Sequence, residues 1–367
     1  MSIESELKKD GIKVIEKLDE FTVYSIAVNV SIRLCSALPH LNIEQKKLQK
    51  KLSNIDMYIA EMPDGMADAN YYFKNSSIYF NKNINFDNIQ DYAVHECIHF
   101  IQEVKDNKNY LVKMGLSDYT GYNIKGLGIN EAAVQLMSSK ILGTASENVK
   151  YFNIYFDTIS PSYYPIECCL VNQLAYLIGE NVLFDSTINS NDNFKNKLIE
   201  ATSKDTYNKI QDSIDTLLNI EEKIIKINNK LLKINNRTKK VDHYIEKINE
   251  YKKEITSTFI NTQNLITTSY FDKKVTTISN VEDIEVYRKQ LYEFKDYLGS
   301  TDNYNFFNEY YVNKMMILEE KYNLFENKNL SLVPKKDSKI SLIFKALRKI
   351  FIKNNATNLE GVKENNK

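Results

Sequence analysis

The chain has 367 residues, 43% of them apolar, which is enough for one large domain or for two domains. Its 48 basic and 48 acidic residues cancel, so no global field draws it to nucleic acid or to an anionic membrane. With no secretory signal, no membrane-spanning apolar run and four cysteines without a disulfide pattern, we expect a cytoplasmic protein.

The first third of the chain carries strand signals. A β-prone run at 56–61 precedes a turn at 63–65, and two further runs at 69–73 and 77–81 are separated by three polar residues. We predict a hairpin in a small sheet. Its edge could either pair with an extended peptide or only complete the core.

Three helices are predicted next. Asp87 and Gln90 have capping-box spacing, and apolar residues then recur at intervals of three and four, which indicates a helix over 88–104. A polar, glycine-containing loop is expected over 106–128. A second helix is predicted over 129–142, closed by Gly143, and a third over 165–179, with Pro165 in its first turn.

The second half of the chain has a different pattern. Apolar residues repeat at helical spacing over 217–234 and 241–255, which predicts an antiparallel helical hairpin, followed by helices over 281–298 and 303–325. The fold class is therefore α+β and predominantly helical. We predict an N-terminal mixed domain over 1–203, a helical bundle over 204–330, and a basic amphipathic helix with a polar tail over 331–367.

The basic segment 334–353 has an apolar stripe along one helical face. Such a helix can lie on anionic lipid or on a partner, but more often a stripe of this kind caps a bundle.

The motif His95-Glu96-Cys97-Ile98-His99 points to metal chemistry. On a helix, His95 and His99 lie one turn apart on the same face, so both imidazoles can reach one zinc ion. Glu96 can then take a proton from a metal-bound water. Cys97 belongs to the apolar stripe and is not expected to be a ligand. The alternative is an ordinary pair of solvated or core histidines.

A second motif, Gly128-Ile129-Asn130-Glu131 through Gln135, follows on the next predicted helix. Together the two motifs resemble the gluzincins, zinc metallopeptidases in which a glutamate from a second helix completes the site. The resemblance covers about 56–179. It implies a zincin-like domain holding one zinc ion through His95, His99 and Glu131, with Tyr164 as a possible stabiliser of the oxyanion.

Gln135 departs from the family pattern, because gluzincins commonly keep a carboxylate there that orients a ligand histidine. An amide raises the basicity of the imidazole less, which implies weaker zinc binding or slower turnover. Ser138 and Asn130 are other possible partners of the histidines.

The leading hypothesis is a zinc-dependent metallopeptidase acting on a peptide or protein, with Glu96 as general base. The alternative is a helical interaction protein with a structural or degenerate zinc site. A phage- or toxin-like protease whose helical region selects one cellular target is a third possibility.

Overall fold

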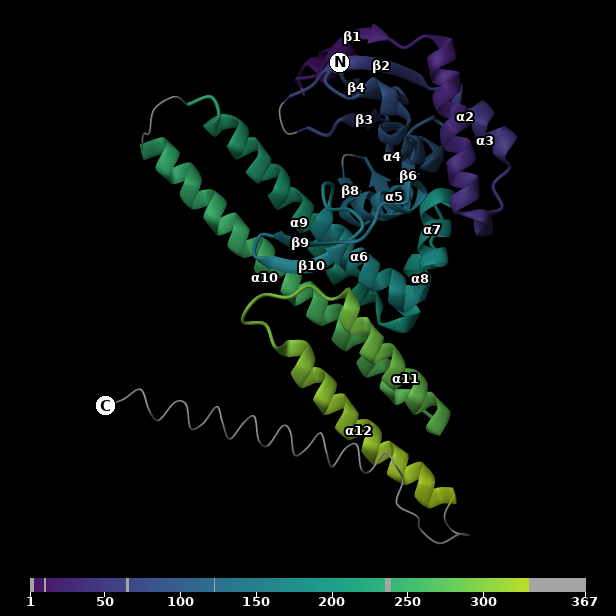
Figure 1. The fold of residues 1–367 in the computed structure, drawn as a ribbon, viewed down its shortest axis with the longest axis vertical. Coiled ribbons are helices and arrows are strands. Elements are labelled where there is room, and N and C mark those ends of the chain that lie inside the picture. The colour runs from purple at the N-terminus through teal and green to yellow at the C-terminus, as the bar shows by residue number, and fades with distance from the viewer. Residues whose placement is uncertain (1–2, 10, 64–65, 122, 235–238, 330–367) are drawn as a thin grey trace. The chain divides into compact units, whose positions relative to one another are not determined.

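The computed structural model describes residues 3–9, 11–63, 66–121, 123–234 and 239–329 (Figure 1). The chain forms two compact units. The first comprises Met1–Ile278 and Glu285–Tyr311 and contains every candidate site residue. The second includes the C-terminal part of the last described helix. Helices predominate and small sheets accompany them, which confirms the predicted α+β class.

A four-stranded sheet forms the N-terminal part of the first unit. Its strands run in the order β1-β2-β4-β3, and β3 occupies an edge. β3 and β4 pair antiparallel as the predicted hairpin, whereas β2 and β4 are parallel. The strands are β1 (Lys13–Lys17), β2 (Asp56–Glu61), β3 (Ala69–Tyr72) and β4 (Ser77–Asn81).

Both faces of this sheet are covered, which is why β4 is apolar along most of its length. One side packs against Leu7 of helix α1 (Ile3–Lys9), together with Ile12 and Met62. The other side faces helix α4 (Ile89–Gln102), which contacts both β3 and β4. Helices α2 (Glu20–Ala37) and α3 (Gln45–Leu52) pack beside each other, and α2 also contacts α4.

The predicted helix over 88–104 is confirmed as α4, but the predicted capping box is wrong. A short 3₁₀ turn, η2 (Phe86–Asn88), precedes the helix, and the Asn85 side chain accepts a hydrogen bond from the backbone N–H of Asp87. Asn85 makes this hydrogen bond because its amide oxygen reaches the N–H two residues further along the chain, which closes a local turn.

The segment predicted as a loop over 106–128 instead contains three strands of a four-stranded antiparallel meander, whose first strand directly follows α4, so that prediction was wrong. Each strand has only three or four residues, which is too short for an alternating apolar pattern to stand out. Gly115 and Gly121 have positive φ at its turns, and Gly126 has positive φ directly after its last strand. The strands are β5 (Glu103–Lys105), β6 (Leu111–Met114), β7 (Ser117–Thr120) and β8 (Asn123–Lys125).

The predicted helices downstream are confirmed. Helix α5 (Leu127–Leu142) ends at Gly143, whose φ of 69° closes the helix, and α6 (Pro165–Ile178) begins at the expected proline. Between them lies a hairpin of β9 (Glu147–Tyr151) and β10 (Ile154–Thr158). Short helices α7 (Glu180–Asn189) and α8 (Asn193–Ala201) follow.

The long helices form the predicted hairpin, with α9 (Lys204–Leu231) and α10 (Lys239–Thr276) side by side (Figure 1). Helices α11 (Val281–Phe294) and α12 (Phe306–Asn329) follow. The basic segment 334–353 and the polar tail lie outside the described residues. No helix in the described part of the chain combines the length and the apolar character needed to cross a membrane.

Helix α9 is attached directly to α5. Both carboxylate oxygens of Asp215 accept hydrogen bonds of 2.7 Å, one from the backbone N–H of Gly126 and one from that of Gly128. The long hairpin therefore caps the start of α5 from outside, where a helix leaves its first N–H groups unpaired. A Cβ on Gly128 would lie 2.8 Å from the carbonyl oxygen of Ile214, so only glycine permits this approach.

Glu167 of α6 and Glu221 of α9 form a pair of interacting carboxyl groups. Glu167 is fully buried, and within the described chain neither of its oxygens has a hydrogen-bond partner. Burial raises the pKa of Glu167 to about 7, and burial together with the charge of Glu167 raises the pKa of Glu221 to about 9. We conclude that these two carboxyl groups stay protonated at pH values at which exposed glutamates are ionised.

The pair should make the stability of the protein fall with rising pH. Because the folded pKa values exceed 4.5, the stabilisation is complete below pH 4.5 and is lost as pH rises through about 7 and then 9. Glu167→Gln should flatten the dependence of the unfolding free energy on pH by about 2–3 kcal/mol between pH 5 and pH 9. Urea unfolding at several pH values measures it.

Glu222→Gln is the matched control, since Glu222 is the exposed neighbour of Glu221 on α9 and its carboxylate pairs with Lys226. Equal pH slopes in wild type, Glu167→Gln and Glu222→Gln would show that the buried pair does not titrate as described.

Candidate metal centre

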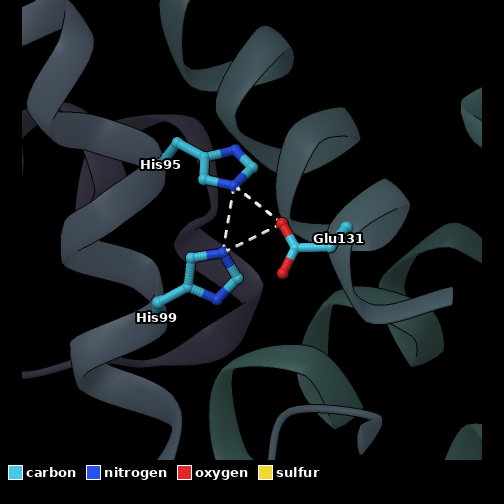
Figure 2. Close-up of side chains that lie close together, drawn as sticks. All are labelled: His95, His99 and Glu131. Carbon is cyan, nitrogen blue, oxygen red and sulfur yellow. Dashed lines mark hydrogen bonds and ion pairs between the residues drawn. The ribbon is translucent and has the colours of Figure 1, made fainter. Parts of the chain in front are cut away.

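Two helices bring three potential ligands together. His95 and His99 project from α4 and Glu131 from α5, and all three point towards one another (Figure 2). The two Nε2 atoms are 3.0 Å apart, and each lies 3.3 Å from Glu131 Oε2. All three side chains are largely withdrawn from solvent. The structure thus brings together the three residues that the resemblance implied as ligands.

These separations suit a small tetrahedral cation. Ligand atoms at 2.0–2.1 Å from a tetrahedral zinc ion lie about 3.3 Å from each other. In the described part of the chain no fourth histidine, cysteine or carboxylate joins the group. The donor set therefore fits zinc and leaves a position for water.

The orientation of His95 is set by Gln135, which lies one turn beyond Glu131 on α5. His95 Nδ1 is 2.9 Å from Gln135 Oε1, while Gln135 Nε2 donates to Ser139 Oγ. An amide oxygen can only accept, so Nδ1 carries the proton and the Nε2 lone pair faces Glu131. The Gln135 amide thus orients the imidazole.

His99 is oriented by Gln102, three residues further along α4. His99 Nδ1 lies 3.2 Å from Gln102 Oε1, and Gln102 Nε2 donates to the carbonyl oxygen of Thr187. Because that carbonyl can only accept, the oxygen of Gln102 must face His99. Asn130 and Gln102 also exchange two hydrogen bonds through their side-chain amides. In the described chain Asn130 makes no hydrogen bond to either histidine.

The two amides create a site that requires a positive charge. With both Nδ1 atoms protonated, the lone pairs of His95 Nε2, His99 Nε2 and Glu131 Oε2 face one point. Burial alone would lower the pKa of His99, but the charge of Glu131 and the hydrogen bond to it raise the pKa to about 9. Burial would likewise raise the pKa of Glu131, but His99 and His95 hold it well below its usual range. Without metal, a proton on His99 supplies the charge.

Gly115 makes room for this arrangement at the turn between β6 and β7. Its φ is +57°, and a Cβ there would lie 2.0 Å from Asn130 Oδ1 and 2.4 Å from Gln102 Nε2. Gln102 had no predicted role, although its position one turn after His99 on the same helix face was the available signal.

Gly115→Ala is expected to lower the unfolding free energy by about 3 kcal/mol, because it adds backbone strain and displaces the amide pair. Gly121→Ala is the matched control. Its φ of +62° imposes similar strain, but in the described part of the chain nothing lies within 4 Å of the added Cβ, so about 1 kcal/mol is expected. Chemical denaturation of both variants measures the difference, and equal losses would contradict the steric explanation.

Glu96 lies beside the three ligands and is 8% exposed. Its Oε2 accepts a 2.6 Å hydrogen bond from the backbone N–H of Tyr71, in the edge strand β3. In the described chain Oε1 has no protein partner. One oxygen is therefore anchored to the sheet, and the other remains available to a water or a substrate. Tyr71 was another residue without a predicted role.

Tyr164 is the N-cap residue of α6 and has a left-handed backbone with φ of 50°. That conformation is uncommon for a residue other than glycine and is maintained here by the surrounding structure. Its ring stacks on that of His95 at a centroid distance of 6.1 Å. Burial, the charges of Glu131 and Glu96 and a hydrogen bond to Glu131 raise the pKa of Tyr164, so the phenol remains a proton donor.

A cavity of about 300 Å³ opens onto these groups and is lined by residues of β3, α4, α5 and the segment before α6. The two remaining histidines, His40 and His243, are exposed and lie outside it.

No protein-family model matches the chain, and neither a curated protein nor a solved structure is significantly similar to it. Functional inference therefore depends on the geometry of the site.

Proposed function

We propose that this protein is a zinc-dependent peptide hydrolase with a zincin-like catalytic domain of the gluzincin type. The observation that supports it most is the triangle of His95 Nε2, His99 Nε2 and Glu131 Oε2, with Glu96 beside it. Three protein donors beside an open cavity are typical of catalytic zinc, whereas structural zinc sites have four protein ligands.

A zinc ion held by His95, His99 and Glu131 would polarise a water and lower its pKa to about 7. The free oxygen of Glu96 would be placed to accept a proton from the attacking water and to return it to the leaving amine. The Tyr71 N–H keeps the Glu96 carboxylate in place during both transfers. The phenol of Tyr164 donates a hydrogen bond to the oxygen that becomes negative on the scissile carbonyl.

The edge strand β3 gives a peptide a place to bind. Ala69, Asn70 and Tyr71 line the cavity, and β3 has a partner on one side only. An extended substrate can add to that free edge through main-chain hydrogen bonds. The N–H of Tyr71 is already used by Glu96, so the substrate must pair with the remaining outward groups of the strand.

The test is metal analysis combined with proteolysis. Purified protein should contain one zinc ion per chain and hydrolyse denatured casein, and 1,10-phenanthroline should abolish hydrolysis until zinc is restored. His95→Ala and His99→Ala should lose the metal, whereas His243→Ala, which changes an exposed histidine of α10, should keep it. A protein that binds zinc but cleaves no peptide would favour the alternative of a structural site in a helical interaction protein.

A further inference from the structure

The charged side chains that line the cavity and are described here are all carboxylates, with no lysine or arginine among them. They are Asp68, Asp91, Glu96 and Glu131. Bound zinc would offset Glu131 and Glu96. Asp91 is offset by Arg33, whose Nη1 lies 2.5 Å from Asp91 Oδ1. Asp68 is the carboxylate whose charge is left uncompensated, since no lysine or arginine in the described chain pairs with it.

Asp68 lies at the entrance to β3, directly before the strand that borders the cavity. Its Oδ2 accepts a hydrogen bond of 2.9 Å from the hydroxyl of Tyr163. Burial and the Asp68 carboxylate raise the pKa of Tyr163, and Tyr92 and Glu96 add smaller effects. Tyr163, Tyr92 and Glu96 line the same cavity as Asp68, so Asp68 belongs to the wall that also carries the general base.

The walls around Asp68 are aromatic. Tyr92 lies one turn before Glu96 on α4, and Tyr163 directly precedes Tyr164; both line the cavity with Asp68. A carboxylate beside phenol rings is the combination that recognises an ammonium or guanidinium group, through a charge-assisted hydrogen bond and cation–π contacts. An acidic side chain entering the same place would meet a charge of its own sign.

We propose that Asp68, Tyr92 and Tyr163 form a subsite for a positively charged group of the substrate next to the scissile bond. This proposal rests on the proposed peptide hydrolysis, because it assigns a subsite of the same cavity. The cationic group is either a lysine or arginine side chain or a free N-terminal amine. Peptides carrying such a group are preferred over neutral peptides by about tenfold, and acidic peptides are disfavoured.

The experiment compares synthetic peptides that differ at one residue. Mass spectrometry of a peptide mixture, with free and acetylated N-termini, first locates the cleaved bond and distinguishes a side chain from a terminal amine. The kcat/KM ratio of a lysine peptide to its norleucine analogue is then measured for the zinc-loaded wild type. Norleucine matches the length of the lysine stem without its charge.

Asp68→Asn should reduce that ratio about tenfold, and Asp68→Lys should invert the preference towards a glutamate peptide. Because each ratio is taken within one variant, a general loss of folded protein cancels. Asp87→Asn is the matched control: Asp87 is exposed in η2 and does not line the cavity, so its ratio should equal that of wild type. A wild-type ratio near one, or a preference that persists in Asp68→Asn, would overturn the subsite.

Binding separates failure of the subsite from failure of the proposed hydrolysis. The affinities of zinc-loaded Glu96→Gln for the fluorescein-labelled lysine and norleucine peptides are measured by anisotropy, with and without Asp68→Asn. A preference for lysine that depends on Asp68, in a protein whose wild type cleaves no peptide, refutes hydrolysis and supports the subsite. Cleavage of all peptides at equal rates refutes the subsite and supports hydrolysis.

Discussion

Replacing Glu96 with glutamine is expected to lower kcat for peptide hydrolysis by about 10³-fold while zinc remains bound. The amide keeps the size of the carboxylate but cannot accept a proton, and general acid–base catalysis typically contributes 10²–10⁴-fold. The three ligand atoms come from other residues, so the metal site itself is retained. Steady-state kinetics on a defined peptide, with the zinc content of the same preparation, measures both effects.

Measuring both the activity and the zinc content of Glu96→Gln distinguishes loss of the general base from loss of the metal. If Glu96→Gln loses zinc, its lost activity says nothing about the base, and Glu96 would have to be counted as a ligand. If the variant retains both zinc and full activity, the assignment of Glu96 as general base is wrong. Loss of activity with full zinc occupancy is the outcome that we expect.

Replacing Glu131 with glutamine should weaken zinc binding by about 10²-fold or more. Glu131 is the anionic member of the group, and its neutral replacement removes the charge that stabilises a buried dication. Competition with a chromophoric zinc chelator gives the dissociation constants of wild type and variant. Equal values would show that Glu131 is not a ligand.

Gln135→Glu is the matched change one turn along the same helix, and we expect it to have the opposite effect on zinc affinity. A carboxylate facing His95 Nδ1 makes the imidazole a stronger donor, so zinc should bind about tenfold more tightly. Because Ser139 also contacts Gln135, circular dichroism and the unfolding midpoint of the metal-free variant control for local rearrangement. Weaker binding in a folded variant would show that Gln135 does not act through His95.

The local elements of this fold follow from sequence where they are long. Helices α4, α5 and α6 repeat their apolar positions over three or more turns, so their existence and approximate bounds were predictable. The meander over β5 to β8 was missed because three- and four-residue strands carry almost no periodic signal. The start of α4 was predicted to within one residue, but the capping box was wrong because the Asn85 side chain, and not that of Asp87, binds a backbone N–H there.

The sequence by itself determined that His95, Glu96 and His99 share one turn of a helix, because the spacing of one turn is a property of the helix alone. The fold also had to bring Glu131 to within 3.3 Å of both imidazoles, and only tertiary packing of α5 against α4 decides that. The amide partners Gln135 and Gln102 were likewise decided by packing.

The same distinction applies to the second half of the chain. Its helical periodicity was readable, but its contribution to the site was not, because Asp215 caps α5 from a position far along the sequence. A hydrogen bond between distant segments depends on how close the fold brings them, and local propensity carries no information about that distance. Sequence thus determined the chemistry on one helix, and tertiary structure decided which other side chains complete it.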